Sequence, residues 1–523
     1  MKIPMLFWKK VNKKPMEACL TLLLILQVLL IALSNLTLID QTLDHDAAKL
    51  LKHIITMWEE KTWAIPQWSY LTTLEWDCTT LFALPLYGLT KNIYLACTLS
   101  NVIFTLILLR VIFLLFEGSD PLYPLLCANL VCIPYRVGML DYYNMLFFSG
   151  AQYIVKILIP LLLIGILLLA EQKKPLVKNR RFWFFTLLYL VLLTVSSSSS
   201  NVYVAACGLA PVFVAYLAYK FLKWERVPSL VFVLIGLSAL CTFLGMRVNE
   251  TLMGGTRAEG MKFCSVYDML NNVSSCFFGL FELVGGATAE FDAVIFSVDG
   301  MIMLAKCLLM AAFLLCGLYA IVKCVKKRGD LRLILLLSVF VWNYFILNVS
   351  YSKAGASTYD YRYHLIGVIP LMCVAAVVMV QWFRGLSNIQ QKWLFLCGFA
   401  AFFMFQVLVF REVFILGEQN KSLKDLVAYV DDMNLETVYT YYSGGEAEIC
   451  RLLGGDCLYL DIDAEGLTMA HDYYSRYEYA PIWTENAIVA VYMRDQGDSF
   501  ELGEHLVVRF DTVGDWTLYY FAS

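Results

Sequence analysis

The stretch LTLLLILQVLLIALSNLTLI, residues 20–39, is followed at once by DQTLDHD, residues 40–46. A run of about twenty apolar residues is long enough to cross the hydrocarbon core of a bilayer as a helix. The run is too long for a typical signal-peptide core, and no small-residue cleavage site follows it, so we expect a retained span. Three carboxylates, Asp40, Asp44 and Asp46, therefore stand where this first span meets water.

The composition of the whole chain is that of a polytopic membrane protein. Of its 523 residues, 60% are hydrophobic and only 16% are charged, and apolar runs recur up to about residue 410. The net charge of -3 and the lack of a long basic tract give no support for nucleic-acid binding. The sequence contains no Walker loop, HExxH or GxSxG motif, so ATP-driven transport, zinc-protease and serine-hydrolase activities have no support either.

Basic segments predict which connections face the cytoplasm. The N-terminal residues 1–17 are lysine-rich and are expected there, and the segments 173–181, 220–226, 326–332 and 384–392 mark the same face. If every apolar run crossed, the basic segment 173–181 would face outward. We therefore expect that the run 78–90, which is short and contains a proline and a glycine, does not cross. We therefore predict about eleven spans, with the C-terminus extracytoplasmic. They cover residues 18–39, 93–116, 121–135, 150–171, 182–195, 202–222, 228–246, 299–325, 331–350, 363–383 and 393–410.

The predicted fold class is mostly α, a polytopic helical membrane domain over residues 18–410 followed by a small extracytoplasmic α/β domain over 411–523. Two long outer loops, 40–92 and 247–298, interrupt the membrane domain. In the tail, SLKDLVAYVDDMN (422–434) has helical spacing with Ser422 as the expected N-cap. Five segments of the tail predict strands: ETVYTYY, CLYLDI, AIVAVYM, HLVVRF and WTLYYF.

Two other features of the sequence concern polar and cysteine-bearing segments. The serine run SSSSSN (196–201) is expected to form a short outer turn. Most of the 16 cysteines lie inside apolar runs, where a buried thiol packs as a small hydrophobic group. Disulfides are open for two pairs in segments expected to face outward, Cys264 with Cys276 and Cys450 with Cys457.

The loop after the first span carries the first candidate site. The segment AAKLLKHIITMW (47–58) has apolar residues at helical spacing and lysines on the other side, which predicts an amphipathic helix along the outer surface. Asp44 and Asp46 stand at its start, and three roles are open for them. They can act as a general base for an acceptor hydroxyl, bind a divalent cation, or cap the helix.

Two further segments add candidate residues at the same expected level. Asp141, in LDYYN, lies between apolar runs, and Tyr142 beside it offers an aromatic face to a sugar ring. Lys156 and Lys306 lie inside predicted spans near their outer ends. An intramembrane charge is a functional candidate, and the alternative is a long side chain that reaches back to the interface.

The segment TYDYRYHLIGVIP (358–370) supplies a cation where the chain re-enters the membrane. The guanidinium of Arg362 can bind a phosphate through two hydrogen bonds, and Tyr361 and Tyr363 add hydroxyls and stacking faces. Acidic, aromatic and basic groups from separate segments are thus expected together at the outer membrane boundary. A substrate that is half lipid and half phosphosugar would span that boundary.

Taken together, these motifs resemble the GT-C superfamily of integral-membrane glycosyltransferases, which use polyprenyl-phosphate-linked sugars. LDHDAAKLLKHIITMW (43–58) looks like the Asp-bearing first loop of that family, and LDYYN (140–144) stands in the place of its second acidic motif. YRYHLIGVIPL (361–371) is similar to the Arg-Tyr-then-Pro stretch that opens a late span in many members. The tail resembles the small outer domains of bacterial members.

The resemblance implies roles for individual residues. Asp44 would be the catalytic base, Asp46 its neighbour or a metal ligand, and Asp141 a second acid of the site. Arg362 would bind the donor phosphate, with Lys156 or Lys306 assisting. Two departures leave metal dependence and the choice between Asp44 and Asp46 open. His45 replaces the family's second acid in the first motif, and the second motif has one acid instead of two.

We therefore expect a hexosyltransferase-type glycosyltransferase of a bacterial cell membrane, acting in polysaccharide biosynthesis. It would move a sugar from a polyprenyl-phosphate donor to a cell-envelope glycan or lipid acceptor on the outer face. No cofactor is certain, and a divalent cation is open. The alternatives are a lipid-linked-glycan flippase or transporter, and a non-catalytic envelope scaffold whose aspartates only cap helices. The sequence shows no repeat of the kind that marks many transporters.

Overall fold

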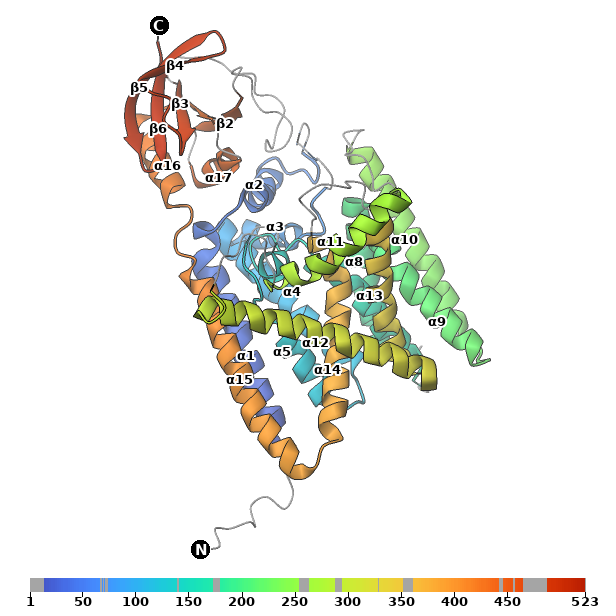
Figure 1. Cartoon of the computed structure of the whole chain (residues 1–523). Helices are drawn as coiled ribbons and strands as arrows, with labels where there is room; N and C mark the ends of the chain where they lie inside the picture. The colour runs from blue at the N-terminus through green and yellow to red at the C-terminus, as the bar shows by residue number, and fades with distance from the viewer. Residues whose placement is uncertain are drawn as a thin grey trace, which may run out of the picture.

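The fold is dominated by long helices, with one small sheet at the C-terminal end (Figure 1). The expected basic segment up to residue 13 and parts of both predicted outer loops lie outside the described residues. The computed structural model describes residues 14–65, 68, 70, 74–138, 141–172, 179–253, 263–286, 294–327, 329–350, 361–441, 445–454, 457–463 and 487–522.

Nine helices of the described part of the chain are long and apolar enough to cross a membrane. They confirm the prediction of a polytopic helical membrane protein. They comprise α1 (Lys14–Leu38), α4 (Ile93–Leu115), α8 (Arg180–Ser200), η4 with α9 (Ala205–Leu209, Ala210–Leu222), α10 (Ser229–Met253), α12 (Val298–Lys327), α13 (Leu331–Ser350), η5 with α14 (Tyr361–His364, Leu365–Arg384) and α15 (Asn388–Ile415).

Two of the eleven predicted spans are shorter helices. The predicted span 121–135 contains α5 (Leu122–Val131), and the predicted span 150–171 contains α7 (Ile154–Ala170). With ten residues, α5 rises only ~15 Å, about half of the hydrocarbon thickness. The run 78–90, expected not to cross, forms α3 (Thr79–Thr90), a helix of only 12 residues that contains Pro85.

The centre of the bundle is α14, whose residues from Leu365 to Val378 are all buried. It packs against α5, α7, α12 and α13, so it contacts several helices that are far apart in the sequence. At one edge of the bundle, α1 and α15 lie side by side, and α8 pairs with α10 on the opposite side (Figure 1). The short α6 (Tyr142–Phe147) and α11 (Val266–Leu283) lie in the connections between the longer helices.

The predicted amphipathic helix is α2 (His45–Glu59), preceded by the short η2 (Ile39–Gln41). Its apolar side chains are buried against α3 and against α17 (Glu446–Leu453) of the C-terminal domain. The expectation that its lysines face away from the apolar side is wrong for Lys49. That side chain is buried because an acidic partner, Glu75, lies beside it.

The serine run 196–201 is not the expected turn, because α8 continues as a helix through Ser200. Serine side chains compete with helical hydrogen bonds unless they find other partners. Here Ser198 Oγ donates to the Thr194 carbonyl, and other serines of the run bond to residues outside the helix. The helix ends at Asn201, which adopts a positive φ of 57°.

The C-terminal domain is a mixed sheet with two helices, α16 (Lys421–Met433) and α17. The strand order is β2-β1-β3-β6-β5-β4, with β1 parallel to β2 and β3 and the other pairs antiparallel. The five predicted strands are confirmed, and the short β4 was not predicted. The strands are β1 (Thr437–Tyr441), β2 (Leu458–Ile462), β3 (Ala487–Tyr492), β4 (Ser499–Leu502), β5 (His505–Val513) and β6 (Trp516–Phe521).

One local expectation is wrong here, and the open question of the two disulfides is answered. Ser422 is not the N-cap of α16, because Asn420 occupies that position and Ser422 Oγ accepts a hydrogen bond from the Asp515 amide at 3.0 Å. All sixteen cysteines are described and free, so neither Cys264–Cys276 nor Cys450–Cys457 is a disulfide. The Cys264 thiol instead faces the Asn348 carbonyl at 3.3 Å.

Candidate functional site

The first candidate acid, Asp44, is the N-cap of α2. Its backbone is extended, and its side-chain Oδ1 accepts a hydrogen bond from the Ala47 amide at 2.8 Å. Burial raises the pKa of Asp44 from 3.8 to about 7, and the nearby Asp46 carboxylate adds repulsion, although the Ala47 amide opposes the rise. A carboxyl group that ionises near neutral pH is suited to general-base catalysis. The capping role and the base role are therefore compatible.

A second acid, Glu75, lies near Asp46. Glu75 Oε1 is 3.3 Å from Lys49 Nζ, and its Oε2 is 3.7 Å from His53 Nδ1. Burial raises the pKa of Glu75, with Lys49 opposing the rise and Asp46 adding to it. Burial also lowers the pKa of His53 to about 3, so that ring is neutral. Glu75 has a positive φ of 63°, a strained conformation that tends to occur at functional sites.

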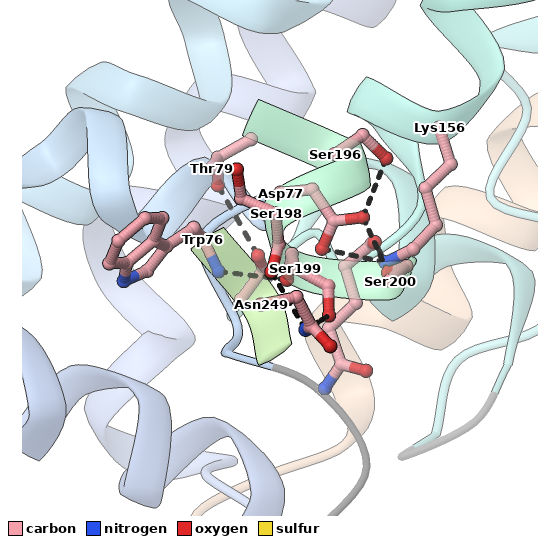
Figure 2. A network of polar contacts seen from close by, with 11 residues as sticks. Trp76, Asp77, Thr79, Lys156, Ser196, Ser198, Ser199, Ser200 and Asn249 are labelled. Carbon is pink, nitrogen blue, oxygen red and sulfur yellow. Dashed lines mark hydrogen bonds and ion pairs between the residues drawn. The ribbon is translucent and has the colours of Figure 1, made fainter. Parts of the chain in front are cut away.

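A buried polar network surrounds Asp77 and holds the segment that contains Glu75 (Figure 2). The Asp77 carboxylate is 3.0 Å from Lys156 Nζ and accepts hydrogen bonds from Ser196 Oγ at 2.9 Å and Ser200 Oγ at 2.8 Å. The Trp76 amide donates to Ser199 Oγ at 3.1 Å. The network thus fixes residues 76–77 to the ends of α7 and α8.

Lys156, predicted as a donor-binding cation, is thus a partner of Asp77. It also donates to the Gln152 carbonyl at 3.0 Å and lies over the Tyr153 ring at 5.1 Å. Sequence reasoning missed both Glu75 and Asp77. The signal that could have pointed to them is the pair of acids in TLEWD (73–77), inside an aromatic-rich segment.

The second acidic motif and the late span meet at Asp141. Its Oδ1 is 3.1 Å from Arg136 Nε and accepts a hydrogen bond from the Tyr361 hydroxyl at 2.5 Å. The Arg136 guanidinium lies over the Tyr361 ring at 5.2 Å. Burial raises the pKa of Asp141, opposed by the Arg136 charge, the Tyr361 hydroxyl and the charge of Lys306. The structure therefore brings Asp141 and Tyr361 together from distant parts of the sequence.

Arg362 and Tyr363 follow Tyr361, the residue that donates to Asp141, in the sequence. The Arg362 guanidinium is 5.6 Å from the Tyr363 ring, and that ring makes edge contacts with Tyr153 and Tyr203. Because Tyr153 also contacts Lys156, aromatic rings connect the Asp77 network with the segment that contains Tyr361.

The other two predicted binding residues have protein partners. Lys306 Nζ forms an ion pair with Glu412 of α15 at 2.9 Å. Tyr142 is fully buried, and its hydroxyl donates to the Val131 carbonyl at 2.7 Å, so its ring is not exposed to a sugar. Within the described ranges, no group of three or more His, Cys, Asp or Glu residues is arranged to hold a metal ion. The divalent cation stays an untested expectation.

The fold is similar to that of two solved membrane proteins of the GT-C type, as the resemblance of the sequence motifs predicted. ArnT from Cupriavidus metallidurans, crystallised with undecaprenyl phosphate, matches with a TM-score of 0.55 and 10% identity over 95% of this chain and 97% of that one. The Archaeoglobus fulgidus oligosaccharyltransferase, crystallised with Zn and sulfate, matches with a TM-score of 0.51 and 12% identity. That match covers 90% of this chain and 68% of the other. No protein-family model and no curated protein sequence matches the chain.

Proposed function

We propose that this protein is a membrane glycosyltransferase that moves a sugar from a polyprenyl-phosphate donor to a cell-envelope glycan or lipid acceptor. The observation that supports it best is the fold match to ArnT, a protein crystallised with undecaprenyl phosphate, over nearly the full length of both chains. In the proposed orientation, α2 and the C-terminal domain face the extracytoplasmic side, and the hexosyl class of the sugar is part of the proposal.

Asp44 is the proposed general base. The acceptor hydroxyl attacks the anomeric carbon of the donor sugar, a new C–O bond forms, and the bond between that carbon and the phosphate oxygen breaks. The hydroxyl proton passes to the Asp44 carboxylate, and the electron pair leaves with the polyprenyl phosphate. A pKa of about 7 suits this role, because the group is substantially ionised at neutral pH and still accepts a proton readily. Asp46 is the alternative base.

The leaving phosphate gains negative charge, and positioned cations stabilise it. Arg362 is the proposed phosphate ligand, with Arg136 nearby through the shared contacts of Tyr361 and Asp141. Asp141 orients Arg136 and the Tyr361 hydroxyl in this scheme. Lys156 and Lys306 act indirectly, because Asp77 and Glu412 already neutralise them. Tyr142 has no role in the proposal.

Substitution of Asp44 by asparagine tests the assignment sharply. Asparagine caps helices about as well as aspartate, so Asp44→Asn keeps α2 intact while it removes the base. The protein is reconstituted into proteoliposomes with a polyprenyl-phosphate hexose and an envelope fraction as the source of acceptor. We expect the release of polyprenyl phosphate to fall by about 100-fold or more. Asp425→Asn, an exposed acid on α16, is the matched control and should transfer at the normal rate.

Unchanged transfer by Asp44→Asn would assign that residue to helix capping alone. Wild-type vesicles that move the intact donor across the bilayer without consuming it would favour the flippase. Vesicles that neither move nor consume it would favour the scaffold.

A further inference from the structure

The loop that leads into Asp44 is bound by a residue of the distant connection between α15 and α16. The backbone amide of Asn420 donates to the Gln41 carbonyl at 3.1 Å. In the amide orientation that satisfies both groups, the Asn420 side chain accepts from the Leu43 amide at 2.8 Å and donates to the Leu43 carbonyl at 3.2 Å. One residue therefore holds three backbone groups of residues 41–43, directly before the candidate base.

The burial of Asn420 makes these bonds specific. Only 3% of the residue is exposed, so water cannot easily replace the bonds that its amide makes. Next to it, Lys424 Nζ pairs with Asp40 Oδ2 at 3.0 Å and with Glu418 at 3.0 Å. Those groups are partly exposed, and exposed ion pairs contribute little. Asn420 is therefore the principal contact between this connection and the loop.

A second contact fixes the other side of the same helix. In Figure 1, α17 of the C-terminal domain lies against α2, and packing between the two helices agrees with that view. The C-terminal domain thus touches α2 through α17, and the connection that begins the domain binds the residues before α2. The Asp44 carboxylate lies between these two contacts in the sequence, at the N-cap of α2.

We propose that Asn420 is a positioning residue for Asp44. Through it, the C-terminal domain fixes the position and orientation of the candidate base. This inference rests on the proposed function. Displacement of a reacting group by about 1 Å can cost 100-fold in rate, so a loop released from Asn420 would lower turnover without removing any group that touches the donor. A residue that only tethers the domain would not separate turnover from donor binding in this way.

The test compares Asn420→Ala and Asn420→Asp with Gln419→Ala in the full-length protein. Alanine removes all side-chain bonds, whereas aspartate can still accept from the Leu43 amide but has no donor for the Leu43 carbonyl. Gln419 is the adjacent, exposed amide and makes a matched control. Hydrogen exchange of the peptide 41–50, measured by mass spectrometry, reports the loop directly. Steady-state release of polyprenyl phosphate from a polyprenyl-phosphate hexose gives kcat and the donor KM.

We expect Asn420→Ala to speed exchange at residues 41–47 about 10-fold and to lower kcat about 10- to 100-fold with the donor KM within twofold. Asn420→Asp should give an intermediate effect, and Gln419→Ala none. Native mass spectrometry with undecaprenyl phosphate checks that each variant still binds lipid and is folded. If the alanine variant does not fold, the aspartate variant decides.

Normal exchange in the Asn420 variants, or faster exchange with unchanged kcat, would overturn the proposal. A rise in the donor KM equal to the fall in kcat/KM would also overturn it, because the residue would then serve binding. If the wild-type protein transfers no sugar, the proposed function fails, and the exchange rates alone then decide whether Asn420 holds the loop.

Discussion

At the scale of single residues, the acids of this protein differ in how their charge is balanced. Asp77 is fully buried, and Lys156 and two serine hydroxyls compensate it. Asp44 has backbone amides as hydrogen-bond donors but no ion pair within the described residues, and its burial leaves the carboxyl hard to ionise. The first environment suits a structural charge, and the second suits a group that exchanges protons.

Removal of the Lys156 charge tests the structural role. Lys156→Met should destabilise the protein by about 3–5 kcal/mol, because it leaves the Asp77 carboxylate buried without a cation. The double variant Lys156→Met/Asp77→Asn should recover most of that loss, since neither charge remains. Denaturant unfolding in detergent measures both, with the exposed Lys421→Met as control. Equal losses in the single and double variants would show that the two side chains are not coupled.

The pKa of Asp44 predicts two pH dependences. Only the ionised base accepts a proton, so kcat/KM should rise with pH through about 7 and then level off. The folded state binds this proton more tightly than the unfolded chain, whose aspartate ionises near 3.8. Folding stability from this group therefore falls as pH rises from about 4 to about 7.

Both profiles have the same control, the variant Asp44→Asn. Its unfolding free energy should lack the loss between pH 4 and pH 7 that the wild type shows. An inflection of kcat/KM near pH 4, together with identical stability profiles for the two proteins, would contradict a raised pKa for Asp44.

At the scale of elements, the crossing of α8 and α10 is what holds the serine-rich end of α8 in place. A Cβ added at Gly245 of α10 would lie 2.5 Å from Ser197 Cβ and 2.8 Å from the Ser198 amide nitrogen and the Thr194 carbonyl oxygen. Close approach of membrane helices through small residues is common. Here it brings the Asn249 side chain to the Ser198 carbonyl, in the same end of α8 whose Ser196 and Ser200 hydroxyls donate to Asp77.

Gly245→Ala should therefore force the two helices apart and destabilise the protein by about 1–3 kcal/mol. Gly236→Ala is the matched control, because it lies on the same helix and no atom lies within 4 Å of the added carbon. It should be neutral, or stabilising by about 0.5–1 kcal/mol from the better helix propensity of alanine. Thermal unfolding of both variants checks the prediction, and equal effects would show that the crossing tolerates a methyl group.

At the scale of the whole molecule, the hydropathy and charge of the sequence predicted the class of fold, and the α2 and strand patterns predicted their elements. Those signals are local, because each element carries its own periodicity. The errors concern residues whose state depends on a distant partner. Ser196 and Ser200 remain helical because Asp77 accepts from them, and Lys49 is buried because Glu75 lies beside it.

In the candidate site, too, some features could be predicted from the sequence and others depend on distant partners. The convergence of Asp141 with Tyr361 agrees with the expected meeting of separate segments, although their catalytic roles stay predictions. Glu75 and Asp77 could not be selected from sequence, since only the folded chain distinguishes a buried acid from one in an aromatic surface segment. Nor could any local pattern indicate that Asn420 would bond to the residues before Asp44.

The ten-residue length of α5 has a consequence for the shape of the interior. Its last carbonyls have no helical partners, and the hydroxyls of Tyr135 and Tyr142 bond to Leu130 and Val131 instead. Phenol rings thus replace the missing turn, and the chain can leave the helix and continue without regular structure as far as Arg136. One extra turn of α5 would occupy that space and displace both the guanidinium and the carboxylate that it meets. The truncation of this helix is therefore what makes room for the Arg136–Asp141 pair.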